Sequence, residues 1–90
     1  MIVNKDRRKA IAAIIERVED MRMQAEQLAQ EVTDLAGDEQ DYLDNMPESL
    51  QGGDRGQAAE EAISQLESAA NDLESIDFDG IVTALESAAA

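Results

Sequence analysis

The sequence predicts an all-α protein built as a long antiparallel helical hairpin of the coiled-coil type. Its first third carries apolar residues at alternating spacings of three and four, the a/d pattern of a helix that packs along its whole length. These residues are Ile11, Ile14, Val18, Met21, Ala25, Leu28, Val32 and Leu35. A second apolar helix face follows a turn-forming segment in the middle of the chain, and no segment alternates as a strand does.

The first helix is expected over about residues 5–36. Asn4 or Asp6 can cap its first free N–H groups. Gly37 is a candidate for its end, because glycine is common directly after the last helical residue. The heptad count nevertheless continues beyond this glycine, so the helix is alternatively expected to resume over residues 38–45.

Tyr42 and Met46 are the residues that continue this count, and Pro47 then ends the helical segment, because the residue before a proline avoids helical geometry. A turn is expected over residues 46–54. The connection joins two antiparallel helices, as in an αα-hairpin.

The second helix is expected over about residues 55–76, with Asp54 as its cap and Gln57 reaching back in capping-box spacing. A bend at residues 77–80 and a last helical segment at 81–88 follow. The packing face of the second helix contains Ile63, Leu66, Ala70 and Leu73.

The 90 residues are expected to form a single helical domain, residues 1–90, with a thin core. Aromatic residues make up 2% of the chain, and alanine, which buries little area, fills much of the apolar pattern. Self-association into a dimer or a higher oligomer is therefore expected, and two hairpins forming a four-helix bundle would satisfy it. The relative orientation of the helices in such an oligomer stays open. β-Branched residues at a and leucine at d suit a parallel dimer, whereas the connection after Met46 favours folding back.

The net charge of −14 is unevenly distributed. Residues 1–22 hold six of the seven basic residues against four acids, and residues 23–90 carry 17 acids against Arg55, a net charge of −16. Such a surface repels nucleic acid and anionic membranes and favours basic protein surfaces. Direct nucleic-acid binding and membrane association are therefore not expected.

The residue inventory excludes several kinds of catalysis. The chain has no histidine and no cysteine, so Ser–His–Asp triads, Cys–His pairs and imidazole metal sites cannot form. Gly52, Gly53 and Gly56 follow no strand and indicate a turn rather than a phosphate-binding loop. We expect no enzymatic activity and no cofactor.

One segment partly matches a calcium-binding loop. Asp77, Asp79 and Glu86 stand where such a loop places oxygen ligands, with Gly80 at its sharp turn. Ser75 occupies the first position, where aspartate is the usual ligand, so this is a weak metal candidate. The alternative is that Asp77 or Asp79 caps the last helix.

The N-terminal basic residues are candidates for anion contacts. They are Lys5, Arg7, Arg8 and Lys9. Copies of this cluster in an oligomer could converge on a small anionic ligand such as a nucleotide. No aromatic residue lies nearby to stack on a base, so the cluster is weak support for nucleic-acid binding.

The middle of the chain resembles small acidic proteins encoded by phages and prophages. The resemblance rests on Tyr42-Leu-Asp-Asn-Met-Pro-Glu-Ser-Leu-Gln51 followed by the Ala- and Glu-rich stretch after Ala58, and it covers residues 42–76 best. The glycines of the turn and the segment Asp77-Phe-Asp-Gly80 depart from that group. The group has no established activity. The resemblance implies only an accessory protein made in the cytoplasm of an infected bacterial cell.

Charge and resemblance together predict a phage-derived binding protein. Its acidic, DNA-mimicking surface would occupy a basic surface of a host protein and inhibit it. The alternatives are a structural or scaffold oligomer of a phage and an oligomeric sponge that binds a small anionic ligand through the N-terminal basic cluster.

Overall fold

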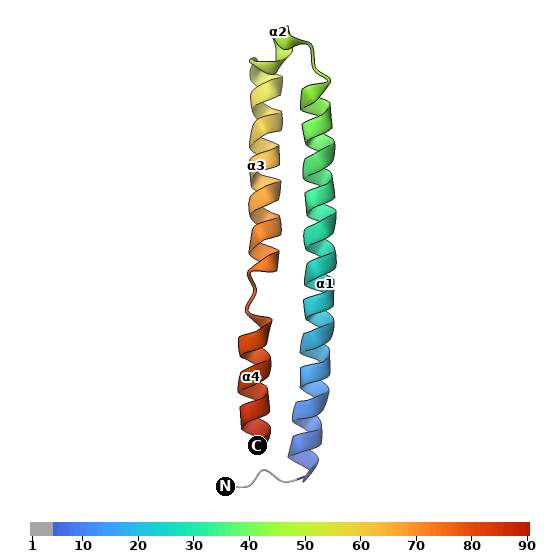
Figure 1. The fold of residues 1–90 in the computed structure, drawn as a ribbon, viewed down its shortest axis with the longest axis vertical. Coiled ribbons are helices and arrows are strands. Elements are labelled where there is room, and N and C mark those ends of the chain that lie inside the picture. Colours follow the sequence, from blue (N-terminus) through green and yellow to red (C-terminus); the bar gives the residue numbers. More distant parts are fainter. Residues whose placement is uncertain (1–4) are drawn as a thin grey trace. The chain divides into compact units, whose positions relative to one another are not determined.

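The computed structural model describes residues 5–90, which form four α-helices and no strand (Figure 1). The helices are α1 (Lys5–Asp44), α2 (Glu48–Gln51), α3 (Asp54–Glu74) and α4 (Phe78–Ala89), of 40, 4, 21 and 12 residues. The all-α class and the helical hairpin that the sequence predicts are therefore confirmed. None of these helices combines the length and the hydrophobicity that crossing a membrane requires.

The chain divides into two compact units, and each contains a part of α1. The first unit comprises the residues up to Ala25 together with Ile76–Ala90. In it, the beginning of α1 lies beside α4 and runs in the opposite direction (Figure 1). The second unit, Glu26–Ser75, holds the rest of α1 with α2 and α3, and its two long helices are also antiparallel (Figure 1).

Helix α1 continues through Gly37, where the sequence offered a possible end. No residue of α1 has a positive φ angle, so Gly37 keeps ordinary helical geometry instead of forming a left-handed cap. The helix ends at Asp44, three residues before Pro47. The heptad pattern that persists to Tyr42 therefore outweighed the helix-breaking tendency of one glycine, which costs about 1 kcal/mol.

A single side chain organises the connection in the second unit. The Gln51 amide nitrogen donates to the carbonyl oxygen of Leu43 (3.2 Å), in the last turn of α1, and to that of Met46 (3.1 Å), just after the helix. Met46 itself is buried. The backbone of Gln51 lies so close to Gly56 that a Cβ atom at this glycine would collide with the Gln51 carbonyl group. Gly56 is thus the residue that lets α2 and α3 approach.

Two capping residues expected from the sequence, Asp54 and Asp6, are not caps in the structure. Gly53, not Asp54, is the N-cap of α3, and no side chain caps that end. Asp54 is the first helical residue, where its carboxylate still suits the helix dipole. At the beginning of α1, Asp6 lies within the first turn, and Asn4 lies outside the described residues.

The break between α3 and α4 is at residues 75–77, earlier than the bend expected at 77–80. Asp77 is the N-cap of α4, and its Oδ1 accepts a hydrogen bond from the Gly80 amide at 2.9 Å. This capping bond explains why α4 already begins at Phe78, because it satisfies one of the free N–H groups of the first turn. The last segment is therefore a separate, capped helix.

The two helical glycines of α1 and α3 are expected to respond oppositely to alanine. Gly37 is exposed with open space around it, so Gly37→Ala should raise the free energy of unfolding by about 0.5–1 kcal/mol. Gly56→Ala should lower it by roughly 1–3 kcal/mol, because the new methyl group must displace the backbone of Gln51. Urea unfolding followed by circular dichroism measures both. Equal effects of the two substitutions would contradict the close α2–α3 approach.

Candidate interaction surfaces

The side of α1 that faces its partner helices is most completely buried at its alanines. Every fully buried residue of α1 is an alanine. We call the whole line the inner stripe, and its members are all buried or half-buried at spacings of four and three: Ile11, Ile15, Val18, Arg22 and Ala25 in the first unit, and Ala29, Val32, Ala36, Glu39 and Leu43 in the second. On α3, Ala59, Ile63 and Ala70 are buried, and Leu66 and Leu73 are half-buried.

A second line of large apolar side chains on α1 points to solvent. Its members, the outer stripe, are spaced by seven residues: Ile14, Met21, Leu28, Leu35 and Tyr42. All five are exposed, with exposed fractions from 44% (Ile14) to 59% (Met21). A spacing of seven residues keeps them close to one line along the helix.

The structure therefore divides the apolar pattern read from the sequence. Ile11, Val18, Ala25 and Val32 belong to the inner stripe, whereas Ile14, Met21, Leu28 and Leu35 are exposed. Sequence reasoning missed the other half of the inner stripe, at Ile15, Arg22, Ala29, Ala36 and Leu43. Its signal was present as a second heptad series. The larger side chains of the outer stripe concealed it.

The first unit is held together by a polar and aromatic cluster around Arg22. Its guanidinium donates to Asp79 Oδ1 at 2.6 Å and, through Nε, to Glu19 Oε2 at 3.0 Å. The same group lies over the Phe78 ring, 5.7 Å from its centroid. Phe78 is buried and begins α4, so Arg22 joins α1 to the start of α4.

The Asp79 hydrogen bond is the main reason why the pKa of Arg22 lies above its ordinary value. Burial acts in the opposite direction, and the negative charges of Asp79 and Glu19 add to the rise. In this arrangement, two of the three candidate calcium ligands have other partners. Asp77 caps α4 and Asp79 pairs with Arg22, and no group of three acidic residues in the described chain is placed to hold a metal ion.

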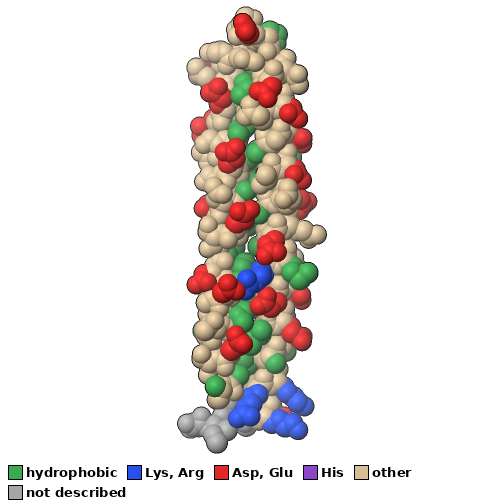
Figure 2. Space-filling view, viewed as in Figure 1, with side chains coloured by type: hydrophobic (Ala, Val, Ile, Leu, Met, Phe, Trp, Pro, Cys, Tyr) green, Lys and Arg blue, Asp and Glu red, His purple; other side chains and the backbone are tan. Residues whose placement is uncertain are grey.

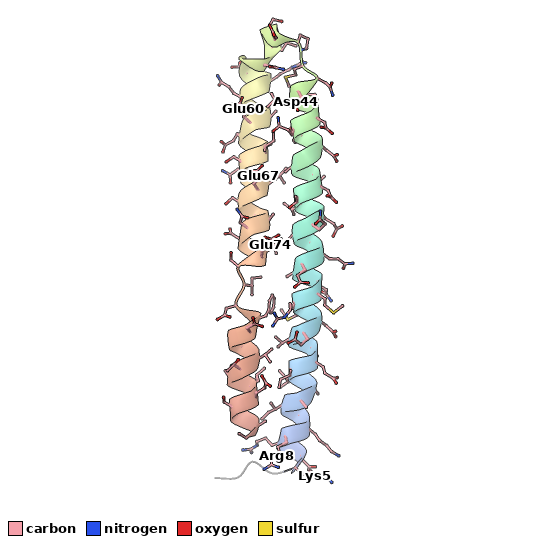
Figure 3. The ribbon with its side chains drawn as sticks, viewed as in Figure 1. Lys5, Arg8, Asp44, Glu60, Glu67 and Glu74 are labelled. Carbon is pink, nitrogen blue, oxygen red and sulfur yellow. The ribbon has the colours of Figure 1, made fainter. Side chains whose placement is uncertain are left out.

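Negative charge is concentrated in the second unit. Residues 26–75 contain fourteen acidic residues and one basic residue, Arg55, which gives −13 of the chain's −14. Thirteen of these acids are exposed, and Figure 2 shows acidic side chains along both long helices of the unit. On α3, Glu60, Glu67 and Glu74 repeat every seven residues and so form one line along that helix (Figure 3).

The basic cluster lies on the first turns of α1. Lys5, Arg7, Arg8 and Lys9 are all exposed, and Figure 3 labels Lys5 and Arg8 at the beginning of that helix. No pocket is found within residues 5–90, at the basic cluster or elsewhere. The structure thus shows these side chains exposed at a helix start.

No protein-family model, curated protein or solved structure matches the chain.

Phe78 should contribute most to the stability of the first unit. Phe78→Ala removes a buried ring together with its contact to Arg22 and should lower the free energy of unfolding by about 3 kcal/mol. Ile81→Ala, three residues further along α4 and 45% exposed, serves as the control and should cost less than about 1 kcal/mol. Urea unfolding compares the two. Equal costs would argue against Phe78 as the core of this unit.

Proposed function

We propose that this protein acts by binding other proteins, and that its acidic second unit occupies a basic surface of its target. The observation that carries the proposal is the charge of −13 on Glu26–Ser75, nearly all of it exposed. Lines of carboxylates on paired helices offer a basic protein surface regularly spaced negative charge, as the phosphates of DNA do. The natural targets of such a surface are proteins that bind DNA.

The biological setting follows from the resemblance of the central turn to small phage and prophage proteins. We propose an accessory protein made in the cytoplasm of a bacterial host. It would inhibit a host protein by occupying the path of its DNA. The residues of that turn have defined structural tasks here. Met46 is buried and Gln51 caps α1, which gives a physical reason for this sequence of residues between two helices.

A second proposal concerns assembly, and the outer stripe favours it. Five large apolar side chains on one line of α1 remain exposed. Exposed apolar side chains in a row are typical of protein interaction sites. We propose that the chain self-associates, as a dimer or as a bundle of hairpins, and this property would also suit a structural component of a phage.

The electrostatic proposal is tested by capture from a nuclease-treated bacterial lysate at low and high salt. A stoichiometric bound protein should be retained at about 50 mM salt, be lost at about 500 mM and be displaced by duplex DNA, because exposed charges are screened within a few ångströms at high salt. Retention that is independent of salt, or indifference to DNA, would contradict it.

A matched pair of variants then locates the binding surface. Glu60→Gln, Glu67→Gln and Glu74→Gln together remove three charges from α3 while keeping side-chain size. The control removes three exposed acids of the first unit by Glu16→Gln, Asp20→Asn and Glu86→Gln. The α3 variant should weaken capture at least about tenfold, on the order of 0.5 kcal/mol per charge, and the control much less. Equal weakening would show that total charge decides binding rather than the second unit.

A further inference from the structure

On α1, the fully buried positions hold small side chains, and a row of large apolar side chains is exposed. The inner stripe holds alanine at its fully buried positions, whereas isoleucine, methionine, leucine and tyrosine occupy the outer stripe. Burying a large apolar side chain contributes far more than burying a methyl group, so the exposed part of the outer stripe is apolar area that α1 could still bury. The outer stripe therefore has the composition of a helix-packing surface, but no other part of the single chain covers it.

We propose that the outer stripe binds the outer stripe of a second copy of this chain, with the two α1 helices antiparallel. This inference rests on the proposed self-association and supplies its surface and orientation. Leu28 is the middle of the five positions, so an antiparallel pair placed symmetrically on it brings Leu28 to Leu28. Met21 then meets Leu35 of the other copy, and Ile14 meets Tyr42. One stripe is thus complementary to itself, as an interface with two-fold symmetry requires.

The distribution of charge along α1 favours an antiparallel second copy over a parallel one. Residues 5–22 carry six basic and four acidic residues, whereas residues 23–44 carry seven acids and no base. Two parallel copies would set the seven acids of one against the seven acids of the other. Antiparallel copies centred on Leu28 instead set residues 12–22 of one helix, which include Arg17, against residues 34–44 of the other, so the two acid-rich ends lie far apart.

One pair of side chains beside the outer stripe has opposite charges and meets only in the antiparallel arrangement. Arg17 and Asp38 are both exposed and belong to the heptad series that flanks the outer stripe on the side away from the inner stripe. When Leu28 meets its copy, Arg17 of one chain comes close to Asp38 of the other, and the symmetry repeats this pair. In a parallel dimer, this flank of one copy lies on the opposite side of the seam from the same flank of the other, so Arg17 and Asp38 would not meet.

The extent of the surface sets the expected affinity. Four heptads with about three contributing positions each give roughly a dozen residues per copy, fewer than the 20–30 of a standard interface. A dimer that dissociates in the micromolar range is therefore expected.

Two methionines provide the matched test of the surface. Met21 lies on the outer stripe, and Met23, two residues later, lies on the opposite side of α1, and both are exposed. Analytical ultracentrifugation should show that Met21→Glu raises the dimer dissociation constant at least about tenfold, because a carboxylate would be buried at the interface. Met23→Glu should leave it within about threefold. Circular dichroism checks that both variants keep the helical content of the parent.

The direction of the helices is tested by mixing two charge variants. Arg17→Glu and Asp38→Arg each place like charges together in the antiparallel dimer, and each should raise the dissociation constant about fivefold. An equimolar mixture should associate as tightly as the parent, since the introduced glutamate of one chain then faces the introduced arginine of the other. The unchanged Asp38 of the first chain likewise faces the unchanged Arg17 of the second. Failure of the mixture to restore association would overturn the antiparallel arrangement.

The outcomes separate the proposals from one another. A parent chain that stays monomeric at about 100 µM would overturn both the outer-stripe dimer, expected to dissociate in the micromolar range, and the self-association. Association that Met21→Glu and Met23→Glu affect equally would overturn the outer stripe as the interface and leave self-association standing. Neither result bears on binding of a basic protein, which the capture experiment measures separately.

Discussion

The most completely buried positions of α1 are alanines, and its packing against the partner helices depends on them. Alanine at Ala25, Ala29 and Ala36 lets a neighbouring helix approach closely, and on α3 Ala59 and Ala70 are buried in the same way. Close approach brings many backbone and Cβ atoms into contact, but it buries little apolar area per residue. The fold is therefore regular in its helix pattern and thin in its core.

Because the seam is thin, a few larger groups fix where each element begins and ends. In the first unit, Phe78 supplies a buried aromatic ring, and Arg22 connects it to α1 through a ring contact and an ion pair. In the second unit, Met46 and Gln51 close the end of α1, and Gly56 allows α3 to start directly against α2. Each group acts near a helix end or a junction, where the alanine seam alone would not set the register.

Besides its thin core, the chain has two exposed surfaces of different chemistry, the acidic second unit and the outer stripe. The acidic residues of the second unit can bind by long-range attraction that salt weakens, whereas the outer stripe can bind by excluding water at short range. Their positions on the helices differ, so a dimer formed through the outer stripe keeps the acidic line of α3 available. The proposed self-association and the proposed binding of a basic partner are therefore compatible with each other. A dimer would also present two acidic units to a target that is itself symmetric.

The heptad spacing by itself determined the helical class, and the break near Pro47 determined the hairpin, because apolar periodicity and proline geometry are local properties of the chain. The uneven distribution of charge along the chain was likewise evident from the sequence alone. Tertiary structure alone decided which heptad series of α1 is buried. Local spacing allows both series. The series that contains Ala29 and Ala36 lies inside and that of Met21 and Leu28 lies outside, because the position of the partner helix decides which face of α1 is covered. The role of Gly56 was likewise decided by the tertiary structure, through the nearby Gln51 backbone.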